Sequence, residues 1–261
     1  MTPSPGPLAA FLTSLPLDFA AACRTAADLG FTHADVVALA DRPAAHREAL
    51  AETGLLVQCA ALGRDLPPGQ ALDATDVAAR RAALELVKRQ LADAAQLGAS
   101  STYIVPGSAD GATALACFAE VCALLADYAG QRMVRLCVEH VPGRALSSAA
   151  TTLDWLEALA HPNLFLLLDV GHCLITGEDA AAVVRRAGPR LAYVHLDDND
   201  GQSDGHWPLL TGRLTRAALE KMVGALRDVG YRGGLALELN PTRDDMVRGL
   251  REGKEVVESV L

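Results

Sequence analysis

Short apolar runs alternate with longer stretches of helical periodicity along the whole chain, and this alternation constrains the fold more than any other feature. Eight apolar runs are typical of buried strands. They span Leu8–Leu12, Ala34–Leu39, Leu55–Leu62, Thr102–Val105, Arg135–Val138, Leu164–Leu168, Leu191–Val194 and Leu235–Leu237. Each is followed by a stretch with helical spacing. These stretches span Asp18–Leu29, Ala44–Glu52, Asp76–Leu97, Thr113–Tyr128, Ser148–Leu159, Asp179–Ala187, Thr215–Val229 and Asp244–Val260.

Strands that alternate with helices pair in parallel through right-handed crossovers. Eight such units within 261 residues predict an α/β fold with a closed parallel sheet, a single (β/α)8 TIM barrel, as one domain over residues 1–261. The rival fold, an open doubly wound sheet, would place a glycine-rich phosphate loop after an early strand. The turn after the first run reads Thr13-Ser14-Leu15-Pro16 and has no such loop.

Glycines mark most of the predicted helix ends. Five of them fall where a left-handed residue is needed just past a helix, namely Gly30, Gly54, Gly98, Gly130 and Gly230. At the other ends, Thr215 and either Thr75 or Asp76 are suited to cap a helix N-terminus.

Composition and charge narrow the classes of partner and compartment. The net charge of −9 is a poor match for a phosphate backbone, so no nucleic-acid partner is expected. Six cysteines without a Cys-x-x-Cys pair indicate free thiols in a reducing compartment, and no secretory signal is visible, so we expect a cytoplasmic protein. The longest apolar stretch, around Ala112–Ala129, carries Glu120 and Asp127, so no membrane span is expected.

A titratable residue directly follows each of the last four predicted strands. In chain order these residues are Glu139, Asp169, His195 and Glu238. Barrel active sites form at the C-terminal strand ends, where neighbouring strands lie about 5 Å apart. Three carboxylates so close repel one another, and no lysine or arginine occupies an equivalent strand-end position. We therefore expect these four residues to bind one divalent metal ion, Mn²⁺, Co²⁺, Mg²⁺ or Zn²⁺.

Two further histidines lie next to this set in the sequence. His172 stands three residues after Asp169, in Asp-Val-Gly-His, where Gly171 is expected to allow a sharp exit from the strand. His140 directly follows Glu139, so strand alternation turns its side chain away from the cluster, and we expect it to be structural.

The long loop after the seventh predicted strand is acidic and rich in turn-forming residues. Its first charged run, Asp197–Asp200, is typical of a solvated loop. Farther along, Asp204 and His206 stand beside Trp207. A tryptophan beside a histidine on a barrel loop indicates one wall of a pocket, so these residues are candidates for substrate binding.

Strand alternation predicts which side chains fill the barrel. If the four strand-end residues point inward, residues two positions earlier also point inward. These are Cys137, Leu167, Tyr193 and Ala236. The intervening residues should face the helix layer instead, namely Leu136, Val138, Leu168 and Val194.

The strand-end motifs together resemble a known superfamily. They read Cys-Val-Glu139-His, Leu-Asp169-Val-Gly-His172, Val-His195-Leu-Asp-Asp-Asn, Asp204-Gly-His206 and Leu-Glu238-Leu-Asn-Pro. This succession is similar to the xylose isomerase-like barrels, which group sugar and sugar phosphate isomerases and epimerases with endonuclease IV-type abasic-site nucleases. The resemblance covers the whole chain as architecture, and its specific motifs lie within residues 135–242.

The resemblance implies roles for individual residues. It implies that Glu139, Asp169, His195 and Glu238 bind one divalent metal, that the two glutamates also act as acid and base, and that His172 contacts substrate.

Two branches of the superfamily fit less well. In the nuclease branch, residues matching His172, Asp204 and His206 bind an extra zinc, but that branch also needs histidines after strands three and four. Here those places read Cys59–Gly63 and Val105–Gly107, without histidine. The ketose 3-epimerase branch has a glutamate and an arginine where this chain has Arg144-Ala145 and Gly201, respectively.

The leading hypothesis is a divalent-metal-dependent isomerase or epimerase acting on a sugar, sugar phosphate or cyclitol. Glu139 and Glu238 would transfer the proton next to the carbonyl through a metal-stabilised enediolate, while His172, Asp204 and His206 bind the substrate. A metal-dependent dehydratase (lyase) of a cyclic polyol ketone is the alternative. A phosphodiesterase of the abasic-site nuclease kind and a non-catalytic barrel are further alternatives. The expected partner is a small-molecule polyol or keto-sugar, and a homo-oligomer is compatible with the sequence.

Overall fold

The computed structural model describes residues 5–107, 111–243 and 245–261, and its centre is a closed barrel of eight parallel strands in the order β1 to β8. The strands are β1 (Leu8–Phe11), β2 (His33–Val37), β3 (Leu56–Ala61), β4 (Ser101–Ile104), β5 (Arg135–Glu139), β6 (Leu164–Asp169), β7 (Leu191–Leu196) and β8 (Gly234–Leu237). Closure comes from the pairing of β1 with β8. The predicted TIM barrel is confirmed, and each strand lies within two residues of its predicted bounds.

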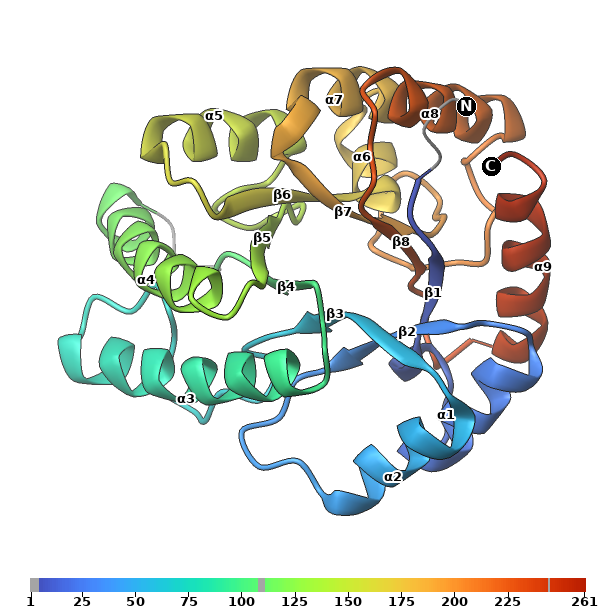
Figure 1. The fold of residues 1–261 in the computed structure, drawn as a ribbon. Coiled ribbons are helices and arrows are strands. Elements are labelled where there is room, and N and C mark those ends of the chain that lie inside the picture. The colour runs from blue at the N-terminus through green and yellow to red at the C-terminus, as the bar shows by residue number, and fades with distance from the viewer. Residues whose placement is uncertain (1–4, 108–110, 244) are drawn as a thin grey trace.

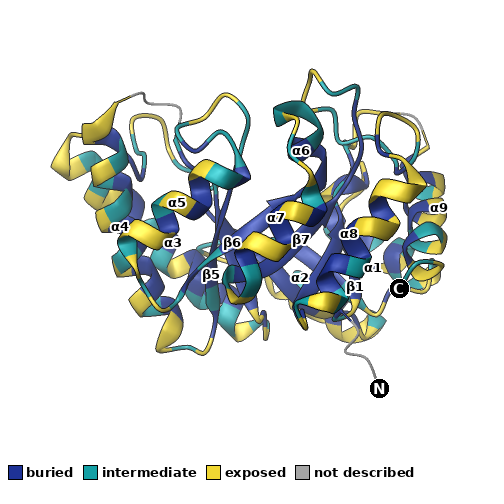
Figure 2. Ribbon diagram, turned by 90° about the horizontal axis from the view of Figure 1, so that it is seen from above, coloured by how far each residue is buried: buried dark blue, intermediate teal, exposed yellow. Residues whose placement is uncertain are grey.

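Helices surround the barrel (Figure 1), and their buried apolar side chains pack in one cluster with the outward-facing side chains of the strands. They are α1 (Phe19–Asp28), α2 (Ala44–Thr53), α3 (Val77–Gln96), α4 (Ala112–Gly130), α5 (Ala149–Leu159), α6 (Val170–Thr176), α7 (Ala180–Ala187), α8 (Arg216–Asp228) and α9 (Met246–Glu258). Short 3-10 turns lie at Leu12–Ser14 and Gly188–Arg190. In Figure 2 the helices nearest the viewer, such as α7 and α8, carry exposed residues on their outward side and buried residues toward the strands.

Most helix boundaries follow the predicted capping chemistry. Asp76 and Thr215 accept hydrogen bonds from Ala79 N and Ala218 N and so cap α3 and α8. Four of the five glycines take positive φ angles, as predicted. The exception is Gly130, which is the last residue of α4 and keeps an ordinary φ, while Met133 takes the left-handed conformation three residues later.

The helix count differs from the sequence prediction at one place. The segment after β6 forms the short helix α6, which the apolar pattern did not predict because seven residues give too few turns for a periodicity. Asp169 caps it by accepting a hydrogen bond from His172 N at 2.8 Å. The last predicted helix begins at Met246 in the structure, and Asp244, at its predicted start, lies outside the described residues.

Alternation along the strands separates two buried layers, as predicted. The four residues expected inside the barrel belong to an inner cluster, together with Phe11, Cys59 and Tyr103. The four residues expected to face the helices belong to the larger cluster between strands and helices. A one-residue shift in any of these strands would exchange the two sets, so the burial fixes which side chains reach the barrel mouth.

Helix α4 meets the length and composition of a membrane span, with a mean hydropathy of 1.5. The sequence-based expectation that two acidic residues rule it out was therefore too strict. In the structure Phe118, Val121 and Leu125 are buried in the layer between strands and helices, whereas Leu124 is 50% exposed. Packing against the barrel thus accounts for the apolar character of the inner face of this helix.

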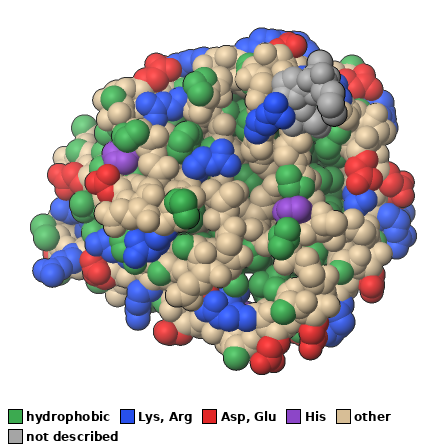
Figure 3. All heavy atoms as spheres, viewed as in Figure 1, with side chains coloured by type: hydrophobic (Ala, Val, Ile, Leu, Met, Phe, Trp, Pro, Cys, Tyr) green, Lys and Arg blue, Asp and Glu red, His purple; other side chains and the backbone are tan. Residues whose placement is uncertain are grey.

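Charged residues are dispersed over the surface. On the face shown in Figure 3, acidic and basic side chains are interspersed around the periphery, and the hydrophobic areas between them are small. The net negative charge of the chain is thus not gathered into one acidic patch on this face.

A buried ion pair ties the segment after β2 to α3. Arg42 donates from Nε to both carboxylate oxygens of Asp93, at 3.0 and 2.9 Å, and from Nη2 to Val37 O at 2.7 Å. Asp93 also accepts from Leu39 N at 3.1 Å. Both side chains are almost fully buried, so each charge depends on the other for its solvation.

Substitution Asp93→Ala should lower the free energy of unfolding by about 3–5 kcal/mol, because it leaves the Arg42 guanidinium buried without its counter-charge. Urea unfolding followed by circular dichroism measures the change. Asp228→Ala is the matched control: it removes the exposed partner of Arg185 and should cost at most about 1 kcal/mol. Equal losses in the two variants would contradict the importance assigned to the buried pair.

Candidate metal centre

The structure brings the four predicted strand-end residues together at the barrel mouth. Glu139 and Asp169 end β5 and β6, His195 lies one residue before the end of β7, and Glu238 directly follows β8. Each offers one ligand atom, and these four atoms lie within 4.8 Å of one another. The strand register explains why two of these residues are close, because Asp169 and His195 are paired on the neighbouring strands β6 and β7.

Both glutamates approach the same ring nitrogen of His195. Its Nδ1 is 2.6 Å from Glu238 Oε2 and 3.4 Å from Glu139 Oε1. Three of the four side chains are nearly inaccessible to solvent, and Glu238 is the most accessible, with 12% of its side chain exposed. Aromatic rings enclose the imidazole, including Tyr103, whose ring centroid lies 5.0 Å away in an edge-to-face arrangement.

Electrostatics in this cluster favour a positive charge. Burial alone would lower the pKa of His195, but the Glu238 carboxylate and the nearby acids Asp35 and Glu139 raise it well above its usual range. Burial likewise would raise the pKa of Glu238, but the charge of His195 outweighs it and lowers the pKa to about 2. Burial and the charge of Asp197 raise the pKa of Asp169 to about 7. The negative charge of these carboxylates therefore favours binding of either protons or a metal cation among the four residues.

The donor set fits a divalent metal ion. Asp169 Oδ2, both ring nitrogens of His195 and Glu238 Oε2 are buried without a hydrogen-bond partner in the described structure. The short Nδ1–Oε2 approach thus lacks hydrogen-bond geometry, as expected for two atoms directed at a common point rather than at each other. Three carboxylates and one imidazole suit a hard or borderline ion such as Mn²⁺, Mg²⁺, Co²⁺ or Zn²⁺.

A second polar cluster adjoins the first. Asp204 Oδ1 lies 3.2 Å from His172 Nε2 and 3.0 Å from His206 Nε2. Burial alone would lower the pKa of His172, but the charge of Asp169 and the Asp204 hydrogen bond raise it to about 10. The ligand atoms of the three residues lie close enough to hold a metal ion, and their polar atoms also suit substrate hydroxyl groups.

The prediction of a solvated run at Asp197–Asp200 was wrong for its first two acids. Asp197 and Asp198 are fully buried, and only Asp200 lies near the surface. Asp197 contacts His206 Nδ1 and helps to raise the pKa of that imidazole. The start of the run turns back into the protein, where Asp198 accepts hydrogen bonds from backbone amides and Asp197 faces His206. The charge pattern alone does not reveal these partners.

Gly171 is needed for close packing and not for the sharp turn that the sequence suggested. Its φ angle is ordinary, but a side chain there would overlap the carboxylate of Asp197. Asn199 also donates from its side-chain amide to Gly171 O at 2.8 Å. This glycine therefore lets the loop after β7 approach α6, which carries His172.

No lysine or arginine occupies an equivalent strand-end position among the described strands, as the sequence indicates, but an arginine from a loop reaches the cluster. Arg64, three residues after β3, donates from Nη2 to Tyr103 Oη at 2.8 Å and lies 3.9 Å from Glu238 Oε1. Its long side chain spans the gap from the loop, so its position in the sequence gave no signal.

Asp35 on β2 was also missed. It is buried inside the barrel, where Tyr193 Oη and Cys59 N donate to its Oδ1 at 2.6 and 3.1 Å. Its other oxygen lies 3.7 Å from His195 Nε2, and burial raises its pKa. A single acid within an apolar strand was the signal that could have identified it, since such a charge needs a partner.

Two neighbouring aromatic residues have structural roles. His140 is fully buried and accepts a hydrogen bond from Asp169 N at 3.3 Å, in agreement with the structural role predicted for it. Trp207, predicted to form a pocket wall, instead pairs through its backbone with Asp198 and carries the Arg243 guanidinium over its ring. It does not line the cavity at the metal centre.

That cavity has a volume of about 120 Å³ and a polar lining. Glu139 and Glu238 open into it from the first cluster, and His172, Asp204 and His206 from the second. The arrangement brings two carboxylates and several hydrogen-bonding groups to one small space. It can therefore bind a hydroxylated molecule and exchange protons with it.

Residues 23–259 match the profile of the family described as xylose isomerase-like TIM barrel. L-ribulose 3-epimerase of Methylomonas sp. (strain DH-1) is 32% identical over 117 residues, which cover 44% of this chain and 38% of that protein. Fructoselysine 3-epimerase of Escherichia coli O157:H7 is 26% identical over 167 residues, which cover 61% of this chain and 60% of that protein. The chain thus spans less than two thirds of the length of these curated relatives.

A solved structure reproduces the fold over nearly the full length. D-allulose 3-epimerase from Methylomonas sp. in complex with D-allulose superposes with a TM-score of 0.84, covering 100% of this chain and 99% of that one. Its sequence is 22% identical, so the likeness is one of fold.

Asp198 anchors the loop that carries Asp204 and His206. Its carboxylate accepts hydrogen bonds from three backbone amides, Asn199 N, Gly212 N and Leu214 N, at 2.8, 2.6 and 2.8 Å.

Asp198→Ala should lower the free energy of unfolding by about 1–3 kcal/mol, because buried amide groups lose their acceptor. Hydrogen exchange across residues 199–214 should accelerate. Asp200→Ala, on the surface of the same loop, is the control and should leave residues 212–214 protected. Unchanged exchange in Asp198→Ala would contradict this role.

Proposed function

The chain belongs to the xylose isomerase-like TIM barrel family, and on that premise we propose that it is a divalent-metal-dependent sugar epimerase or isomerase. The observation that carries the proposal is that Glu139 and Glu238 both approach His195 Nδ1, at 3.4 and 2.6 Å, and both line the same polar cavity. Two carboxylates facing one polar cavity are the minimum for removing a proton from one place and returning it at another.

Glu139 and Glu238 are the proposed acid and base. One takes the proton from the carbon next to the substrate carbonyl, and the other returns a proton to the opposite face of that carbon or to the neighbouring carbon. The first outcome is epimerisation and the second is isomerisation. The lowered pKa of Glu238 keeps this side chain ionised at neutral pH, which suits the accepting role at the start of the reaction.

The remaining polar residues hold the reacting groups in place. Asp169 and His195, with the two glutamates, would bind the metal ion. When bound, such an ion supplies positive charge that polarises the carbonyl and stabilises negative charge on its oxygen. His172, Asp204 and His206 would bind substrate hydroxyl groups, and the hydrogen bond from His172 Nδ1 to His140 O at 2.6 Å fixes the orientation of the His172 ring.

The proposed substrate is a keto-sugar or related polyol. The relatives named above are 3-epimerases of L-ribulose, fructoselysine and D-allulose, which supports proton transfer beside a ketone. None of the three is a dehydratase, so the lyase alternative gains no support from them. Hydroxyl-binding side chains around a small cavity also agree with a sugar.

We assign the enzyme to carbohydrate metabolism in the cytoplasm and expect Mn²⁺ as its ion. Oxygen-rich donor sets with a single imidazole suit Mn²⁺. The six cysteines are unpaired, and five of them are buried, which agrees with a reducing compartment.

Metal binding can be measured by thermal unfolding. Mn²⁺ at about 100 times its dissociation constant should stabilise the wild-type protein by about 2.7 kcal/mol. His195→Gln should abolish this stabilisation because it removes the only nitrogen ligand of the set. His161→Gln is the control, since His161 pairs with Asp127 through a partly exposed contact. An unchanged response of His195→Gln to Mn²⁺ would refute the proposed metal centre.

Proton transfer can be measured by NMR as exchange of the substrate proton with deuterated solvent. Glu139→Gln should slow exchange by about 10²–10⁴-fold, because an amide cannot accept the proton. Glu157→Gln, at an exposed position on α5, should exchange at the wild-type rate. Exchange at the wild-type rate in the folded Glu139→Gln protein excludes Glu139 as acid or base.

A further inference from the structure

A second and larger cavity opens beside the metal centre. Its volume is about 690 Å³, compared with about 120 Å³ at the metal centre. It lies between the segment that joins β3 to α3 and the C-terminal end of β4, and the first turn of α4 closes one side. Val105 and Arg144 line both cavities. A molecule seated at the metal centre can therefore extend past these two residues into the larger space.

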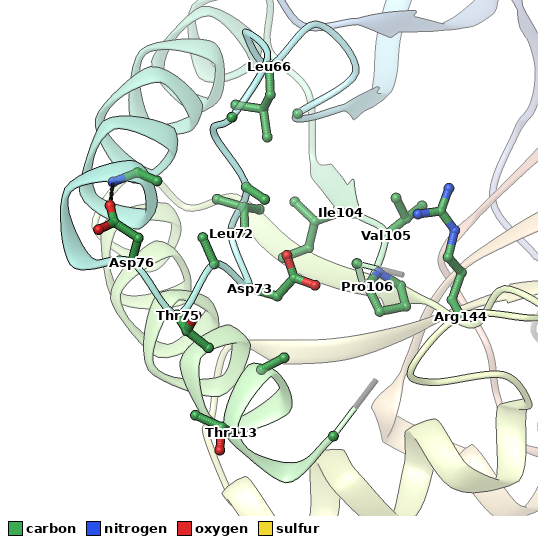
Figure 4. A pocket seen from close by; sticks show the side chains of 18 of the residues that line it. Leu66, Leu72, Asp73, Thr75, Asp76, Ile104, Val105, Pro106, Thr113 and Arg144 are labelled. Atoms are coloured by element: carbon green, nitrogen blue, oxygen red, sulfur yellow. Dashed lines mark hydrogen bonds between the residues drawn. The ribbon is translucent and has the colours of Figure 1, made fainter. Parts of the chain in front are cut away.

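One wall of this cavity is apolar. Leu66 and Leu72 come from the segment before α3, and Ile104 and Pro106 come from the end of β4 (Figure 4). Leu66 is partly exposed, whereas Leu72, Ile104 and Pro106 are buried and form the base of this apolar wall. An alkyl chain is better matched to this wall than further hydroxylated carbons, because it loses no hydrogen bonds to water when it is buried.

Asp73 breaks this apolar lining. Figure 4 shows its carboxylate projecting toward Ile104 and Pro106, and only 7% of the residue is exposed. Within the part of the chain that the structure describes, no group donates a hydrogen bond to it and no basic side chain pairs with it. A carboxylate of low exposure that lines a cavity attracts positive charge, and a cation brought by a ligand would pair with it there.

Gly107 leaves the room that Asp73 uses. A side chain at Gly107 would overlap the Asp73 carboxylate. The backbone at Gly107, just after β4, therefore packs directly against the Asp73 carboxylate, which lies at the cavity wall.

We propose that this cavity binds the distal part of an elongated substrate, an alkyl spacer ending in a protonated amine that pairs with Asp73. The proposal rests on the proposed function, since it takes the other end of the same molecule to be the sugar at the metal centre. The substrate class is therefore an amine-bearing sugar conjugate, with Arg144 and Val105 at the junction of its two parts.

Charge favours an amine over a phosphate or carboxylate at the distal end. Asp73 is the buried charge in the cavity, and it would repel an anion in surroundings where screening by water is weak. Arg144 lies at the exposed rim between the two cavities, where its charge is largely solvated and adjoins the sugar end of the ligand.

The test uses matched pairs of ketohexoses. A 6-aminohexyl chain is attached as an ether to O1 in one compound and to O6 in another, and each is compared with its N-acetylated form. For at least one attachment, the wild-type enzyme should show a kcat/KM about tenfold or more higher for the amine, as expected for a charge-assisted hydrogen bond. Asp73→Asn should abolish that preference and leave kcat/KM for unsubstituted ketohexose within about twofold of wild type, because the amide keeps the shape without the charge.

Two further variants complete the design. Asp28→Asn, at an exposed position on α1, removes one negative charge elsewhere and should keep the preference for the amine. Thr113→Trp narrows the cavity from an exposed position near the start of α4. It should raise KM for all chain-bearing compounds and leave unsubstituted ketohexose unaffected, so the cavity is tested even if Asp73→Asn does not fold.

The outcomes separate this inference from the proposed function. If unsubstituted ketohexose reacts but the amine has no advantage at either attachment, the cavity assignment is overturned and the proposed function stands. If no sugar exchanges its proton, titration calorimetry with the same compounds decides. Tighter binding of the amine that Asp73→Asn abolishes supports the cavity and refutes the proposed function, whereas equal binding of amine and acetylated forms refutes the cavity.

Discussion

Repulsion among three carboxylates at one end of the barrel is the constraint on which the site depends. Closure of the parallel sheet brings Glu139, Asp169 and Glu238 around His195 in surroundings with little water. Like charges in such a place are stable only if positive charge lies between them. The raised pKa of His195 and the close approach of Arg64 to Glu238 are two consequences of the same field. A divalent cation is a third way to satisfy it.

The supporting residues are arranged to keep these charges in position. Asp35 lies beneath the imidazole inside the barrel, while Asp197 and Asp198 anchor the loop after β7 through buried contacts. Gly171 permits that loop to approach α6. The two polar clusters are thus built from different strands but share one framework, so that loss of a buried acid in either cluster affects the placement of the other.

The barrel and the positions of the four strand-end residues could be predicted because both follow from local periodicity. Alternation with period two assigns the inner and outer faces of each strand, and parallel pairing places the strand ends at one mouth. The short helix α6 and the burial of Asp197 could not be predicted in this way. One is too short to show a period, and the other depends on partners such as His206 that reach it from elsewhere in the loop.

The sequence by itself determined the eightfold strand–helix order, the side of each strand that faces the barrel, and the identity of the four converging residues. Tertiary structure alone decided that Arg64 reaches Glu238, that Asp35 lies against His195, and that Asp73 faces a cavity beside the candidate metal centre. The physical reason is the distance along the sequence over which each interaction acts. Strand alternation is set by neighbouring residues along the chain. These contacts instead join loops and strands that are far apart in sequence, and they depend on side-chain length and on how closely the backbones approach.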